Sequence, residues 1–102
     1  MTDCRPVRVR DGLDVFVWTG EAGDTGLPLI VDFRQLTVAV TKGAVLEGTL
    51  DPDVAGRWFP LQDQDGTPTG LRDRLVTVRE RVYQVRPVFK DAGEVRLHMG
   101  RP

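Results

Sequence analysis

One histidine and one cysteine are the side chains that could serve this chain as a catalytic base or a reactive thiol. His98 lies in a segment that alternates apolar and polar residues, and Cys4 lies near the amino terminus. Nucleophilic catalysis needs a base within hydrogen-bonding reach of the nucleophile and an acid that orients the base. The chain contains no nucleophile-elbow motif that would supply such an arrangement. The sequence therefore predicts a protein that is not an enzyme.

Two polar segments resemble ligand-binding loops only in part. Residues 19–26 are rich in glycine but lack the Gly-Lys-Ser/Thr ending with which a P-loop holds phosphate. Asp63-Gln64-Asp65-Gly66 resembles the start of a calcium loop, but Arg74 takes the place of the bidentate glutamate that closes an EF-hand. We interpret the first segment as a flexible loop and the second as a solvated turn. We expect neither a cofactor nor a metal.

Length and composition favour one ordinary globular domain. The chain has 102 residues, of which 40% are hydrophobic and 28% charged. The formal net charge of −1 predicts no long-range attraction to nucleic acid or to an anionic membrane. A single cysteine allows no internal disulfide, which is typical of a reducing compartment. The first residues do not form a secretory signal, and no apolar run approaches the ~20 residues of a membrane-spanning helix, so we expect no membrane partner.

Alternation of apolar and polar residues predicts strands over most of the chain. The candidate strands are residues 6–10, 14–18, 36–40, 44–50, 72–78, 81–89 and 94–99. The last three predict an antiparallel meander with Pro87 at a bulge or on an edge. Residues 36–40 and 44–50 predict a hairpin in which Gly48 marks a bulge or a close backbone approach. Residues 32–35 could form one short helical turn.

These elements predict an all-β fold for residues 1–102, a small antiparallel β-barrel or sandwich with long polar loops and at most one short helix. Residues 1–12 would include an extended arm, and residues 19–26 and 62–70 would be mobile loops. So small a domain cannot bury every apolar strand face, so copies of the chain or other proteins could cover the remainder. The candidate interface residues are Trp18, Trp58, Phe59, Asp63, Asp65, Arg72, Arg74 and Arg96.

Two alternatives remain open for these interface residues. Trp58 and Phe59 could anchor an interface, or they could pack in the core or under a lid. The arginines cluster in the final third of the chain, where few aromatic residues are interleaved with them. Pairing with carboxylates of neighbouring subunits is therefore as compatible with the arginine cluster as a nucleic-acid face.

Several short motifs in the second half of the chain carry a resemblance to a known family. They are Arg72-Asp73-Arg74-Leu75, the strand Val82-Tyr83-Gln84-Val85, Arg86, the turn Asp91-Ala92-Gly93 and the closing Leu97-His98-Met99-Gly100-Arg101. In order and spacing they resemble the small head–tail joining proteins of long-tailed, lambda-like phages. Residues 38–52 are similar to the first hairpin of that family, which leads into a long loop. Residues 1–32 depart from it, because family members often open with a helical segment.

The resemblance implies a structural virion protein that forms a sixfold or twelvefold ring at the neck between head and tail. One face of the ring would meet portal or adaptor proteins, and the other would meet the tail terminator or the tail tube protein. Such a ring would help to retain packaged DNA, which it would contact only in the channel and without sequence preference. The implied location is the neck of the virion, assembled in the host cytoplasm.

Two other functions are compatible with the same residues. One is a different neck or tail component, such as a tail terminator. The other is a monomeric small β-barrel module that binds a peptide or an oligonucleotide. A shared fold cannot separate these functions, whereas the mass of the protein in solution with and without portal or tail partners would.

Overall fold

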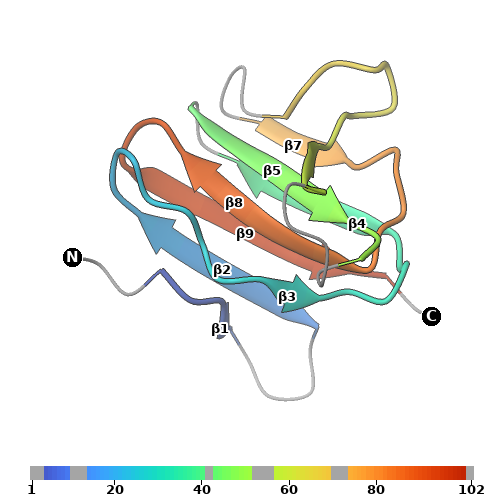
Figure 1. Ribbon diagram of the computed structural model, residues 1–102, viewed down its shortest axis with the longest axis horizontal. Coiled ribbons are helices and arrows are strands. Elements are labelled where there is room, and N and C mark those ends of the chain that lie inside the picture. Colours follow the sequence, from blue (N-terminus) through green and yellow to red (C-terminus); the bar gives the residue numbers. More distant parts are fainter. Residues whose placement is uncertain (1–3, 10–13, 41–42, 52–56, 70–73, 101–102) are drawn as a thin grey trace.

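A computed structural model describes residues 4–9, 14–40, 43–51, 57–69 and 74–100, which form two antiparallel sheets (Figure 1). The strands are β1 (Val7–Arg8), β2 (Val15–Gly20), β3 (Leu29–Ile30), β4 (Leu36–Val40), β5 (Ala44–Thr49), β6 (Phe59–Pro60), β7 (Arg74–Thr77), β8 (Gln84–Phe89) and β9 (Gly93–Met99). The five-stranded sheet has the order β1-β2-β9-β4-β7, and the four-stranded sheet has the order β3-β8-β5-β6. None of the described residues is helical, so they include no helix that could cross a membrane.

The two sheets pack face to face as a sandwich around one hydrophobic core. Alternate residues of the central strands point inward, as in the pattern of buried Val95 and Leu97 in β9 and buried Ala44 and Leu46 in β5. Trp18 of β2 is fully buried, and its Nε1 donates a hydrogen bond of 3.0 Å to the Leu27 carbonyl. The all-β prediction is confirmed in its sandwich form. The barrel alternative is wrong, because the sheets do not close on one another.

Consecutive strands often lie in different sheets, which corrects two predictions. β8 belongs to the four-stranded sheet and β9 to the five-stranded sheet, so the predicted meander is wrong. β4 and β5 are likewise divided between the sheets, so the predicted hairpin is wrong as well. The connection from β4 to β5 and the connection from β8 to β9 contact each other, because the Lys90 N–H donates a 2.8 Å hydrogen bond to the Gly43 carbonyl. Alternation indicates which face of a strand is buried, but it does not identify the neighbouring strand.

The segment 31–34 forms a tight turn with left-handed backbone conformation. The sequence predicted a right-handed helical turn over residues 32–35. Asp32 and Phe33 have φ values of 48° and 60°, and the Arg34 N–H donates to the Val31 carbonyl at 3.0 Å. The helical prediction is therefore wrong. Backbone bonds impose the observed shape, since the Asp32 N–H donates to the Tyr83 carbonyl at 3.0 Å. The Arg34 side chain holds the other end of the turn by donating to the Gly100 carbonyl at 2.5 Å.

Neither Gly48 nor Pro87 marks a bulge. The pairing of β5 with β8 runs without interruption from Ala44 opposite Phe89 to Thr49 opposite Gln84. Pro87 lies within β8, between β3 and β5 rather than on an edge, and its carbonyl accepts a 2.8 Å hydrogen bond from the Gly26 N–H. The nitrogen and the carbonyl of a strand residue point to the same side, so the Pro87 nitrogen also faces the segment at Gly26. The pairing of β8 with β5 therefore loses no hydrogen bond at Pro87.

The segments predicted as an arm and as mobile loops make specific backbone contacts. β1, in the predicted arm, is the edge strand beside β2. In the segment 19–26, the Gly23 N–H donates to the Phe89 carbonyl, and the Phe89 N–H donates to the Asp24 carbonyl, both at 2.8 Å. In the segment 62–69, Asp63 forms an isolated bridge with Val78, next to β7. Whether these segments move stays a prediction.

Candidate functional site

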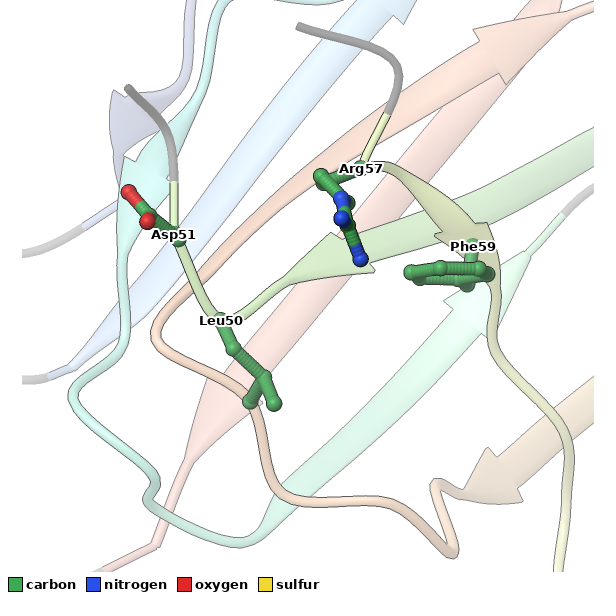
Figure 2. A pocket seen from close by; sticks show the side chains of 4 residues that line it. All are labelled: Leu50, Asp51, Arg57 and Phe59. Atoms are coloured by element: carbon green, nitrogen blue, oxygen red, sulfur yellow. The ribbon is translucent and has the colours of Figure 1, made fainter. Parts of the chain in front are cut away.

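An apolar surface with a charged rim lies where β5 ends and β6 begins. Leu50 and Phe59 are 67% and 60% exposed, which is unusual for large apolar side chains that lie beside one another. With Asp51 and Arg57 they line a pocket of about 240 Å³ (Figure 2). In this view Arg57 and Phe59 form one wall, on the chain that enters β6, and Leu50 and Asp51 lie across from them.

A second hollow of about 310 Å³ shares Leu50 and Phe59 with the first. It is lined by Gly48, Thr49, Leu50, Phe59, Pro60, Leu61, Glu80, Arg81 and Val82. Leu50 and Phe59 therefore border both hollows, and we call these two side chains the apolar ridge. We call the ridge and its charged neighbours Asp51, Arg57, Glu80 and Arg81 the end surface.

The exposure of Phe59 follows from its cross-strand partner. Phe59 lies opposite Gly48 and points to the same face of the sheet. A Cβ placed on Gly48 would lie 2.7 Å from Val82 Cγ2 and 3.0 Å from Leu61 Cδ2, so these two side chains already fill that space. Val82 and Leu61 are buried, and the Phe59 ring is left outside the core.

Trp58 fixes the segment from which Phe59 projects. The Arg86 guanidinium lies over the Trp58 ring, 4.2 Å from its centroid. Arg86 Nε also donates to Glu47 Oε1 at 3.1 Å, and these two residues are direct cross-strand partners in β8 and β5. The stack of Trp58, Arg86 and Glu47 covers the outer face of the sheet, opposite to the face of Gly48. The short edge strand β6 is thus held by side chains as well as by its two backbone pairs.

The segment after β6 is ordered by a buried carboxylate. Asp63 is 5% exposed, and its Oδ1 accepts hydrogen bonds from the N–H groups of Asp65 at 2.9 Å and Thr67 at 3.0 Å. These bonds stabilise the turn 63–67, in which Gly66 has a φ of 82°. The Thr69 hydroxyl oxygen then accepts a 2.9 Å hydrogen bond from the Leu46 N–H. The Asp63 carboxylate is therefore directed at its own turn.

The structure brings together only part of the predicted interface set. Trp58 and Phe59 lie at the end surface, with Asp65 exposed on the turn that follows, whereas Trp18 is enclosed in the core. Arg96 lies in β9, in the other sheet, with its side chain 51% exposed. The backbone of Arg74 begins β7, and Arg72 lies outside the described residues.

Sequence reasoning missed Leu50, Arg57 and Arg81 as members of the end surface. Leu50 is part of the candidate strand 44–50, although β5 ends one residue before it. Its position directly before Asp51-Pro52 is the signal that could have identified it, because a proline excludes continuation of a central strand. Arg57 and Arg81 carry no local signal, since only the fold brings residues 57 and 81 to the same ridge.

The end surface offers apolar and charged side chains with which another molecule could make contact. In the part of the chain that the structure describes, no group of three or more His, Cys, Asp or Glu residues could hold a metal ion. His98 lies on the exposed side of β9 and Cys4 is buried. What the end surface offers is two aliphatic or aromatic side chains framed by two acidic and two basic groups. An apolar side chain of another protein could be buried there with its polar neighbours paired.

Fold and surface together define an antiparallel β-sandwich with an exposed apolar ridge at one end. No protein-family model matches the sequence, and a comparison with curated proteins finds no match either.

Proposed function

We propose that this protein is a structural subunit of a phage virion, which forms a ring at the head–tail junction. In this role it joins the portal or its adaptor proteins to the tail terminator or tail tube, and it helps to retain packaged DNA. Copies of the chain associate in a sixfold or twelvefold ring. DNA passes through the channel and is contacted without sequence preference, in keeping with a net charge of −1.

The observation that carries the proposal is the exposure of Leu50 and Phe59, two large apolar side chains that line the same pocket. Large apolar groups in water cost free energy, roughly 25 cal/mol for each Å² that burial would remove. Trp58, the residue before Phe59, packs on Arg86, and Val82 and Leu61 fill the space over Gly48, the cross-strand partner of Phe59. A pre-ordered apolar ridge is suited to a permanent contact, because little conformational entropy is lost when a partner covers it.

The charged rim gives the contact its direction. Asp51 and Glu80 supply negative charge and Arg57 and Arg81 supply positive charge around the ridge. A neighbour with the complementary order of charges is favoured, and a neighbour in the wrong orientation meets like charges. A ring needs such oriented contacts, because each subunit must present one surface to the neighbour on one side and another surface to the neighbour on the other.

Mass measurements with the predicted partners test the proposal. The purified chain is mixed with portal, adaptor and tail-end proteins encoded beside it, and the complexes are weighed by mass photometry. We expect ring-sized complexes with the wild type and at least a tenfold weaker complex with Phe59→Asp. Ile30→Asp is the matched control, since it places the same charge on an exposed apolar residue of β3, at the opposite edge of the four-stranded sheet from β6. A chain that stays monomeric with every partner but binds a peptide or oligonucleotide tightly would instead support the binding module, and a ring at the tail end alone would support a tail terminator.

A further inference from the structure

The outer face of the five-stranded sheet carries two rows of side chains, of which the first runs across all five strands and the second across four. Backbone pairing places Val7, Val17, Arg96, Ala39 and Leu75 in one row. The next row consists of Val15, His98, Thr37 and Thr77, with Val9 beside Val15 through a 2.9 Å hydrogen bond between their backbones. The intervening residues of β2, β4 and β9 point into the core, so both rows face away from it.

This face is more apolar than the solvent side of a sandwich requires. Val7, Val9 and Leu75 are 59%, 47% and 70% exposed. The solvated face of an antiparallel sheet is ordinarily polar, and here only the central strand β9 follows that rule, with Glu94, Arg96 and His98. The strands on both sides of β9 present mainly valine, alanine, leucine and threonine. The face therefore has the composition of a contact surface, with an apolar area around a few charged groups.

The face is hollowed beside its most exposed residue. A cavity of about 330 Å³ is lined by Val15, Thr37, Ala39, Leu75, Arg96 and His98. It lies where β4 contributes only the small side chains of Thr37 and Ala39, whereas Leu75 of the neighbouring β7 is 70% exposed. One surface thus offers both a projecting leucine and a hollow that can receive an aliphatic side chain.

We propose that this face is the contact through which two copies of the chain pair. A two-fold interface uses the same patch on both subunits, so the patch must be complementary to itself. This one combines a projection with a hollow, and it combines opposite charges, with Arg96 Nε 3.9 Å from Glu94 Oε1. Copies with a net charge of −1 repel one another only weakly.

The size of the face sets the strength of the pair. The five strands contain 2, 6, 7, 5 and 4 residues. At ~3.4 Å per residue and ~4.8 Å between strands, the face covers roughly 400 Å² on each copy, or roughly 800 Å² for two copies, which is the size of a weak and transient interface. The fraction of chains that form the pair therefore rises with protein concentration, and the pair dissociates on dilution. This pairing goes beyond the proposed function and uses a surface separate from the end surface. The pair and the contact at the end surface can therefore form independently.

Sedimentation velocity of the purified chain over a range of concentrations tests the pair. The wild type shifts from monomer to dimer as concentration rises, and Leu75→Asp raises the dissociation constant at least tenfold. Ile30→Asp is the matched control, because it adds the same charge to a half-exposed isoleucine of β3, in the other sheet and outside the end surface, and it leaves the dissociation constant within twofold of the wild type. Thermal unfolding of each variant, followed by circular dichroism, verifies that the fold is retained.

A charge exchange gives a second, independent readout. Arg96→Glu removes the positive charge that lies beside Glu94 and adds a negative one, so two copies repel and pairing weakens. The double variant Glu94→Arg/Arg96→Glu restores both signs on the face and recovers pairing to within about threefold of the wild type. A wild-type chain that is monomeric at every concentration would overturn the proposal. So would a dimer that Ile30→Asp abolishes and Leu75→Asp does not, or a monomeric chain whose Leu75→Asp variant loses a different neck protein.

Discussion

Phe59 lies directly opposite Gly48, and Val82 occupies the space that a side chain at position 48 would need. This arrangement links the core to the end surface. Val82 is buried in the space over Gly48, and the Phe59 ring is left exposed to solvent. The strand β6 has only two residues, yet contacts on its flank position it. Two backbone pairs join β6 to β5, and the contact of Trp58 with Arg86 holds the residue that precedes it.

Gly48→Ala should destabilise the protein by about 1–3 kcal/mol, because its new methyl group would lie 2.7 Å from Val82 Cγ2. Chemical denaturation measures the change in the free energy of unfolding. Combining Gly48→Ala with Val82→Ala should restore part of the loss, since the smaller residue at position 82 makes room for the methyl group. Strict additivity of the two single changes would contradict this account of Gly48.

The Trp58–Arg86 contact should show a coupling free energy of about 0.5–1 kcal/mol. The single variants Trp58→Ala and Arg86→Ala and their double variant complete the thermodynamic cycle, again by denaturation. Because Arg86 also pairs with Glu47, a cycle of Arg86 with Glu47→Gln separates the ion pair from the ring contact. Coupling that is absent from the first cycle and present in the second would show that Trp58 does not hold β6.

Asp32→Gly should raise the free energy of unfolding by about 0.5–1 kcal/mol, because Asp32 has a φ of 48° and glycine adopts that conformation without steric cost. Gln35→Gly is the control, as an exposed residue of the same segment that is not among the residues with positive φ in the described part of the chain. The control should lower the melting temperature. Destabilisation by both changes would mean that residues 31–34 do not form the left-handed turn.

Stability should fall in acid through Asp14. The hydrogen bond from Arg34, at 2.6 Å, lowers the pKa of the Asp14 carboxyl below its ordinary value of 3.8, despite an opposing effect of burial. A carboxyl whose pKa is lowered by folding stabilises the fold above its unfolded pKa, and this contribution is lost as pH falls through the lower folded pKa. Asp14→Asn should therefore melt at a lower temperature than wild type at pH 7, and the difference should shrink as pH falls below the ordinary pKa of 3.8. A difference that persists unchanged in acid would rule out the ionised carboxylate as its cause.

The strands were predictable from sequence because burial imposes alternation locally. Val95, Leu97 and Met99 follow that pattern in β9, and the structure places all three on the buried side. The topology was not predictable in the same way. A tight turn such as the one between Phe89 and Gly93 can equally join two neighbouring strands or two facing sheets, and only long-range packing decides which.

The end surface was predictable only where a single residue carries the signal. Trp58 and Phe59 stood out as adjacent aromatics, but their separate fates depend on Arg86 and Gly48, which lie far away in sequence. Trp18 showed the opposite outcome. The sequence predicts an interface residue, whereas the fold buries Trp18 in the core. The burial leaves no polar group unsatisfied, because the indole N–H donates a hydrogen bond to the Leu27 carbonyl.

The most direct test of the central proposal is to locate the protein in assembled particles. Phage particles produced with a small epitope tag at the end of this chain are labelled with antibody and imaged by electron microscopy. We predict label at the junction of head and tail, and particles without tails or with leaking DNA when Phe59→Asp replaces the wild type. Label on the head shell or the distal tail, or particles that lack the protein yet retain both tail and DNA, would contradict the proposal.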